Sequence, residues 1–133
     1  MQDKPKLKRS DLIYPELSYQ IIGILFSVFN QLGYGYREKY YQRAIKNELL
    51  NFKIPFKEQI TFPVGYKDKI IGRNIFDFLI DNKIILEIKR GDHFSQRDII
   101  QTTGYLKSAG LKLAILARFS SRGLKFKRII NIK

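Results

Sequence analysis

Apolar positions along this chain follow two spacings, one typical of helices and one typical of strands. Apolar residues three and four apart predict amphipathic helices, and short runs rich in Ile, Leu and Phe between turn residues predict strands. We expect helices over residues 16–32, 36–51 and 95–108, and strands over residues 57–66, 70–80, 84–89, 111–117 and 124–132. The order is therefore α-α-β-β-β-α-β-β, and the fold class is α/β, with a central mixed sheet flanked by helices.

The length and composition of the chain fit one domain with one core. Its 133 residues are 44% hydrophobic and include ten Phe and eight Tyr, which is enough apolar volume to fill a core of that size. We assign residues 16–133 to this domain. Residues 1–15 carry three lysines and one arginine, and we expect them to form a basic N-terminal arm that can be disordered.

Several classes of protein are excluded by what the sequence lacks. The absence of cysteine excludes disulfides, cysteine-bound zinc and iron–sulfur clusters, and it is compatible with a reducing cytoplasm, where we expect the protein to act. No uncharged apolar run reaches the roughly 18 residues of a membrane-spanning helix. The charged start of the chain lacks the apolar segment of a signal peptide, so we expect no membrane partner.

Two apolar runs, at residues 75–80 and 84–89, are typical of antiparallel strands joined by a tight connection. If that connection holds three residues, Asp77 pairs with Glu87 across the hairpin, with Cβ atoms about 5 Å apart. A two-residue loop would instead put Glu87 on the opposite face. Two like charges at this spacing among apolar neighbours are tolerable when one carboxylate is protonated or when a cation lies between them.

This pair suits the hydrolysis of a phosphodiester with a divalent metal ion. Mg²⁺ prefers oxygen ligands and commonly binds one or two carboxylates together with phosphate oxygens of a substrate. Asp77 and Glu87 are the candidate ligands, and the backbone carbonyl of Ile88 is a further one. Lys89 projects from the same face as Glu87, where it can orient the attacking water or stabilise charge in the transition state. The competing interpretation is an ordinary cross-strand salt bridge.

The helix predicted after these strands carries two further candidates. Ser95 is its expected N-cap and Asp98 lies in its first turn. Gln101 and Tyr105 are four apart and therefore lie on one face; the alternative is a solvated Gln101 and a Tyr105 that packs with its hydroxyl at the surface. Gly104 costs about 1 kcal/mol relative to Ala in a helix, which predicts the close approach of another element.

The charge of the chain is a second indication of its function, beside the acids and the lysine. Twenty-five Lys and Arg against twelve Asp and Glu give a net charge of +13, and a surface of this kind binds phosphate backbones with strong salt dependence. The alternative is a surface that only keeps the protein in solution. Residues 99–133 contain no acid, and their candidate phosphate contacts are Arg118, Arg122, Lys125, Lys127 and Arg128. Rings and cations interleave in a second group, which suits contact with bases and phosphates: Tyr36, Lys39, Tyr40 and Arg43.

Taken together, these motifs resemble the PD-(D/E)xK nuclease superfamily. Asp77, the Glu87-Ile88-Lys89 triplet and the following Q-x-x-x-Y motif stand in the order of that superfamily, and the last motif is similar to its RecB-like branch. The resemblance extends from about residue 16 to residue 130. One departure is Phe76, which stands where the name of the superfamily suggests Pro.

A motif upstream narrows the resemblance. The spacing of Gly35, Glu38 and Tyr41 is similar to the G-x-x-E-x-x-Y signature of the GxxExxY proteins, a small family of the same superfamily. This resemblance implies that Glu38 is an additional acid of the site, supplied by an N-terminal helix. From the residues alone, Glu38 is equally well explained as a first-turn acid satisfied by free backbone amides.

The resemblance also implies roles for the other candidates. Asp77 and Glu87 would be metal ligands and Lys89 the catalytic lysine, while Gln101 and Tyr105 would line the site from the helix that follows. The implied function is a Mg²⁺- or Mn²⁺-dependent nuclease, with DNA favoured over RNA. The alternatives are a non-catalytic nucleic-acid-binding protein and an accessory subunit that retains the fold. The sequence leaves open endo- or exonuclease action, and whether a homodimer or a partner protein is involved.

Overall fold

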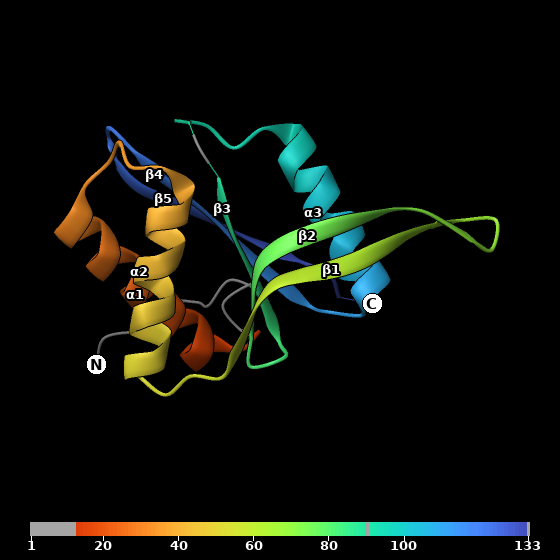
Figure 1. The fold of residues 1–133 in the computed structure, drawn as a ribbon, viewed down its shortest axis with the longest axis horizontal. Coiled ribbons are helices and arrows are strands. Elements are labelled where there is room, and N and C mark those ends of the chain that lie inside the picture. The colour runs from red at the N-terminus through yellow and green to blue at the C-terminus, as the bar shows by residue number, and fades with distance from the viewer. Residues whose placement is uncertain (1–12, 90, 133) are drawn as a thin grey trace, which may run out of the picture.

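The computed structural model describes residues 13–89 and 91–132, and its elements follow one another as predicted (Figure 1). They are α1 (Pro15–Leu32), α2 (Glu38–Asn51), β1 (Phe56–Tyr66), β2 (Lys69–Ile80), β3 (Ile84–Lys89), α3 (Gln96–Ala109), β4 (Leu113–Ser120) and β5 (Gly123–Ile130). The predicted α/β class and element order are confirmed. Most of the predicted basic arm, residues 1–12, lies outside the described residues. Within the described ranges, no helix is long and apolar enough to cross a membrane.

The sheet has five strands in the order β1-β2-β3-β4-β5. Its β3–β4 pair is parallel, and the other three pairs are antiparallel. Two parallel neighbours need a long crossover connection, and α3 supplies it. Figure 1 shows α1 and α2 together on one side of the sheet and α3 on the other. The sheet is therefore mixed and covered by helices on both faces, as the pattern predicted.

Each face of the sheet has its own core cluster. Side chains alternate between the faces of a strand, so the even-numbered residues of β3 pack with α1 and α2, whereas Ile85 packs with Leu106 of α3. Every residue of β4 is buried, because this strand has packed neighbours on both faces. By the same alternation, Glu87 and Lys89 lie on the α3 side of the sheet.

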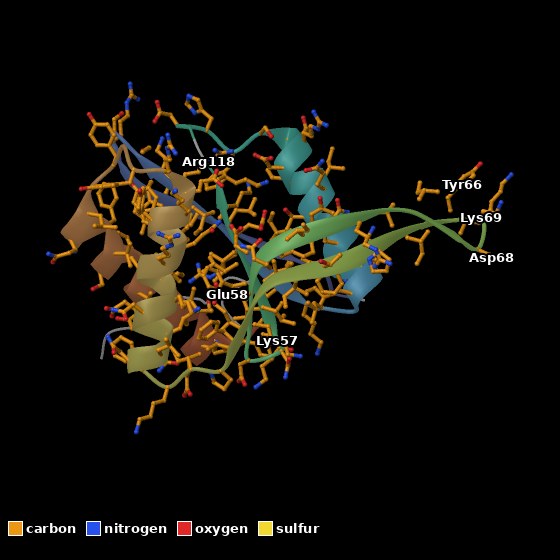
Figure 2. The ribbon with its side chains drawn as sticks, viewed as in Figure 1. Lys57, Glu58, Tyr66, Asp68, Lys69 and Arg118 are labelled. Carbon is orange, nitrogen blue, oxygen red and sulfur yellow. The ribbon has the colours of Figure 1, made fainter. Side chains whose placement is uncertain are left out.

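The β1–β2 hairpin extends beyond the rest of the molecule (Figure 1), and Tyr66, Asp68 and Lys69 mark its tip (Figure 2). Tyr66 pairs with Lys69, so the turn holds two residues, Lys67 and Asp68, with φ of 46° and 67°. Two residues with positive φ make the turn type that matches the twist of the strands. The predicted turn over residues 67–69 was therefore one residue too long.

Gly104 does not have the role that the sequence predicted. The residue is exposed on α3, and a Cβ added there would meet no atom within 4 Å. The expected close approach of another element was therefore wrong, and nothing in the structure explains a glycine at this position. The start of α3 is as predicted, because Ser95 Oγ accepts a hydrogen bond from the Asp98 N–H. Gly110, with φ 68°, ends the helix.

The connection between α1 and α2 is fixed by Tyr41. Its hydroxyl donates to the Gly33 carbonyl at 2.8 Å and accepts the Tyr36 N–H at 3.3 Å. Its ring stacks on Phe119 of β4, with ring centroids 4.1 Å apart. Gly35 has φ +99°, a conformation that favours glycine. The first and last residues of the G-x-x-E-x-x-Y motif thus hold this connection against the end of β4.

Removing the hydroxyl of Tyr41 should destabilise the protein. Tyr41→Phe keeps the ring on Phe119 but leaves the Gly33 carbonyl and the Tyr36 N–H without this partner, so we expect the free energy of unfolding to fall by about 1–3 kcal/mol in urea denaturation. Tyr19→Phe is the matched control, because Tyr19 is 79% exposed and should change stability by less than about 0.5 kcal/mol. Equal effects of the two substitutions would contradict this role of Tyr41.

Candidate active site

Asp77 and Glu87 lie where the ladder between β2 and β3 stops. The last described pair of that ladder is Phe78 with Leu86. Beyond it, the Asp77 N–H donates to Glu87 Oε1 at 2.8 Å, and the Ile88 N–H donates to Asp77 Oδ2 at 2.7 Å. Each carboxylate therefore accepts a hydrogen bond from the backbone of the opposite strand, where a regular ladder would offer a backbone carbonyl.

The backbone on both sides of Asp77 explains this geometry. Ile80 pairs with Ile84, so the connection before β3 holds three residues and the register that places Glu87 opposite Asp77 is confirmed. On the other side of β2, Gln59 has φ 49° and has no partner in the described β1–β2 register. The buried side chains of β2 also change to the other face of the sheet here. Phe78 packs in the cluster under α1 and α2, whereas Phe76 packs in the cluster under α3. The hairpin thus twists at Asp77.

Burial raises the pKa of both carboxyl groups. The pKa of Glu87 rises to about 7 because the group is buried and faces the charge of Asp77. Burial also raises the pKa of Asp77; the hydrogen bond from the Ile88 N–H lowers it, and the charge of Glu38 raises it further. Two carboxylates that interact this strongly titrate as a pair. Near neutral pH the pair shares a proton or requires a cation.

The ammonium group of Lys89 lies between two acids. It is 3.5 Å from Glu87 Oε2 and 3.7 Å from Asp98 Oδ1. The other oxygen of Asp98 accepts a hydrogen bond from Arg118 Nη2 at 2.7 Å. Arg118 is only 4% exposed, and its guanidinium lies over the ring of Phe94, 5.0 Å from the centroid. A chain of alternating charges thus connects β3, the start of α3 and β4.

The charges around Asp98 keep it ionised. Burial by itself raises the pKa of Asp98, but hydrogen bonding to Ser95 and the positive charges of Lys89 and Arg118 lower it below the usual value of 3.8. Asp98 and Glu87 thus both restrain the ammonium group of Lys89. The sequence had indicated Asp98 only as a first-turn acid, and this contact with Lys89 was missed.

A second contact was missed on the side of α2. Gln42 Nε2 donates to Asp77 Oδ1 at 2.9 Å. Glu38, the first residue of α2, is one helical turn before Gln42 and lies close enough for its charge to raise the pKa of Asp77. The spacing of four residues between Glu38 and Gln42 was the available signal, because such residues share one face of a helix. The seven-residue spacing from Asp98 to Tyr105, about two helical turns, was the corresponding signal in α3.

The two candidates on α3 are placed differently. The Tyr105 ring packs edge-on against the Phe76 ring, with ring centroids 4.3 Å apart. Burial raises the pKa of its hydroxyl, Lys89 lowers it, and the charges of Glu87 and Asp98 raise it further, so Tyr105 lies beside the charged cluster. Gln101 is exposed, and among the described residues no hydrogen bond joins it to the cluster. The structure therefore brings Tyr105 to the acids and leaves Gln101 facing solvent.

Candidate nucleic-acid contacts form an exposed group at the start of α2. Lys39 Nζ lies 5.3 Å and the Arg43 guanidinium 5.9 Å from the centroid of the Tyr40 ring. The Tyr36 ring meets the Tyr40 ring edge-on at 6.2 Å. A pocket of about 290 Å³ lies beside this group, and Tyr36, Glu38 and Lys89 are among the residues that line it. The predicted rings and cations of α2 are thus neighbours of the acid–lysine cluster.

The candidate phosphate contacts of the C-terminal third divide into three groups. Arg122 and Lys127 are exposed. Lys125 donates to the Asp92 carbonyl at 3.2 Å, and Arg128 donates to Ser18 Oγ at 3.0 Å. Arg118 corrects the prediction of an exposed phosphate contact, because β4 is buried on both faces and its guanidinium is bound to Asp98. A charged residue inside an apolar strand was the signal for this internal role.

The chemistry of the site fits a divalent cation. Among the described residues no group of three or more His, Cys, Asp or Glu is arranged to hold a metal ion. The Asp77–Glu87 pair nevertheless offers hard oxygen ligands of the kind that Mg²⁺ binds, and carboxylate oxygens keep lone pairs beyond those used by their hydrogen bonds to Gln42 and the two strands. Their mutual repulsion, visible in the raised pKa of Glu87, is what a bound cation would relieve.

The fold is a mixed α/β domain in which two acids and a lysine come from adjacent strands. The chain belongs to the PD-(D/E)XK nuclease superfamily, whose family profile matches residues 15–129. No curated protein sequence matches the chain. Among solved structures, the crystal structure of SSO0001 is similar in fold, with a TM-score of 0.54 and 15% sequence identity over 94% of this chain. This chain spans 61% of the length of that structure.

The raised pKa of Glu87 predicts how stability depends on pH. Between the usual value of 4.5 and about 7, the folded protein keeps a proton that the unfolded chain has released, so stability falls as pH rises. The melting temperature measured in EDTA should therefore fall across this window, and Glu87→Gln should flatten the decline. Glu48→Gln removes an α2 carboxylate outside the site and should keep the slope of the parent protein. A Glu87→Gln variant with the parental slope would contradict the assignment.

Proposed function

We propose that this protein is a Mg²⁺- or Mn²⁺-dependent nuclease that hydrolyses phosphodiester bonds, with DNA favoured over RNA. The observation that carries the proposal is a pair of carboxylates, the half-buried Asp77 and the buried Glu87. Each is hydrogen-bonded to the strand of the other, and Glu87 is ion-paired with Lys89. Membership of the PD-(D/E)XK nuclease superfamily supports the same chemistry. A net charge of +13 supports a polyanionic substrate.

Asp77 and Glu87 would hold the metal ion together with the Ile88 carbonyl, and Glu38 would add a further oxygen from α2. When bound, the ion activates a water molecule and neutralises charge on the scissile phosphate. Gln42 supports this assignment, because its amide holds one oxygen of Asp77 and thereby fixes the orientation of the carboxylate. Such supporting hydrogen bonds commonly orient metal ligands.

Lys89 would be the catalytic lysine. Its ammonium group is already restrained by Glu87 and Asp98, so little reorganisation is needed when charge develops on the phosphate. Tyr105 lies beside the same groups and would complete the wall of the site on the α3 side. The exposed Gln101 would act on the substrate only from the rim.

The finer family assignment is also a proposal. Gly35 and Tyr41 hold the α1–α2 connection, and Glu38 lies near Asp77, so all three residues of the G-x-x-E-x-x-Y motif have a structural place beside the site. This supports membership of the GxxExxY family. The Q-x-x-x-Y motif supports the RecB-like branch, and with it the preference for DNA.

A non-catalytic nucleic-acid-binding protein is the second candidate. The observation in its favour is that Lys89 is ion-paired with both Glu87 and Asp98, an arrangement that a purely structural charge cluster would also have. The two functions differ in whether turnover occurs. Incubating the purified protein with single-stranded, double-stranded and branched DNA and RNA, in Mg²⁺, Mn²⁺ or EDTA, separates them.

Substitutions of the two acids and the lysine should abolish cleavage of nucleic acid but leave its binding intact. We expect Asp77→Ala, Glu87→Ala and Lys89→Ala each to reduce the cleavage rate by at least about 100-fold. Affinity measured in EDTA should change little, because phosphate contacts come from the wider basic surface. The measurements are single-turnover cleavage of a labelled oligonucleotide and its binding by fluorescence anisotropy.

The other end of the same hairpin offers a matched control. Asp81 and Lys83 form an exposed ion pair at 3.4 Å in the connection between β2 and β3, so Asp81→Asn with Lys83→Ala removes an acid and a lysine outside the site. This double variant should cleave at the parental rate. Asp77→Ala cleaving as fast as the control would overturn the catalytic assignment, and a parent protein that binds without cleaving any substrate would favour the second candidate.

A further inference from the structure

The pocket beside Lys89 has the composition of a site for a flat aromatic group. Its volume is about 290 Å³, and aromatic side chains from the α1–α2 connection, α2 and β4 contribute to its wall: Tyr34, Tyr36, Tyr41 and Phe119. This volume is near the lower limit of about 300 Å³ for small-molecule sites, which suits one nucleotide-sized group. The wall also includes Ile88 and Lys89, so the pocket borders the proposed catalytic lysine.

The aromatic rings that line this pocket differ in their exposure and in their contacts with other rings. Tyr41 and Phe119 stack on each other with parallel planes, and Tyr41 is buried. Tyr36 is 48% exposed and Tyr34 is 61% exposed. The described ring contacts of Tyr36, to Tyr40 and Tyr41, are both edge-to-face, at 73° and 89°. Tyr36 is therefore positioned by its neighbours without being used in a parallel stack.

The backbone of Tyr36 is fixed as well. Its N–H donates to the Tyr41 hydroxyl, and Gly35 before it has φ +99°. A ring on a restrained backbone loses less conformational freedom when a partner stacks on it. Ser121 also lines the pocket, and a serine hydroxyl can meet the hydrogen-bonding edge of a base.

We propose that this pocket binds one unpaired nucleobase of the substrate, stacked on Tyr36, next to the phosphate that lies at Lys89. This deepens the proposed nuclease function, on which it rests, by naming the substrate class as nucleic acid with an unpaired nucleotide beside the cleaved bond. In a continuous duplex every base is stacked and paired, and placing one in a side pocket costs a few kcal/mol of unstacking. An unpaired base enters without most of that cost.

Three DNA duplexes of one sequence test the proposal. The first is fully paired, the second carries one bulged base, and the third carries a bulged abasic nucleotide, which keeps the sugar and phosphate but lacks the base. Binding is measured by fluorescence anisotropy in EDTA, where cleavage is blocked. Stacking of a base on an aromatic side chain contributes about 1–3 kcal/mol, so we expect the parent protein to bind the bulged base about 5- to 150-fold more tightly than the abasic bulge.

Substitutions of exposed tyrosines test whether the pocket causes this difference in affinity. Tyr36→Leu should remove most of the preference for the bulged base, and Tyr36→Phe should retain it because the ring remains. Tyr66→Leu is the matched control: Tyr66 is 58% exposed and has a lysine over its ring, but it lies at the tip of the hairpin (Figure 2). This control should keep the parental preference. Unchanged melting temperatures check that each variant is folded.

Equal affinity of the parent protein for the base and abasic bulges would overturn the proposal. So would a Tyr36→Leu variant that keeps the full preference. Neither result touches the nuclease function, which is read separately by adding Mg²⁺ to the same duplexes and to single strands. A parent protein that binds none of these nucleic acids at low salt would instead contradict the proposed function itself.

Discussion

Two carboxylates, the half-buried Asp77 and the buried Glu87, occupy the place where the β2–β3 ladder would otherwise continue. Each accepts a backbone N–H from the opposite strand, so they hold the end of the hairpin together although their charges repel. Burial and this repulsion raise the pKa of Glu87 to about 7. The interaction that closes the sheet at this point is therefore also the one that leaves a site in need of a proton or a cation.

The surrounding structure restrains this pair from both faces of the sheet. On the α3 side, Asp98 binds Lys89 and is itself bound by the buried Arg118, so the ammonium group is held near Glu87 by a charge network that spans three elements. On the side of α2, Gln42 holds Asp77. Single-acid substitutions in such a network leave a buried charge without its partner, which is costly. The position of Lys89 thus depends on α3 and β4 as much as on its own strand.

Much of this arrangement could be predicted from the sequence, because it depends on local regularities. Strand alternation placed Glu87 opposite Asp77 on the condition that the connection holds three residues, a length that the sequence left open against two and the structure decides. The N-cap Ser95 was sufficient to start α3. Contacts between distant elements carried no such signal: the pairing of Asp98 with Arg118 joins residues 20 apart, and it turned an expected phosphate contact into an internal one. The twist at Gln59 was also unpredictable, because a positive φ at a non-glycine residue follows from tertiary packing rather than from local preference.

The most direct test of this site is Mn²⁺ binding measured by isothermal titration calorimetry, without any substrate. Binding of the ion should depend on the carboxylate pair, because the ion relieves the repulsion between Asp77 and Glu87. We expect the parent protein to bind Mn²⁺ with a defined stoichiometry, the Glu87→Gln variant to lose that binding, and the Asp81→Asn control to keep it. Binding that persists unchanged in Glu87→Gln, or a parent protein that shows no specific binding, would contradict the assignment of the pair as a metal site.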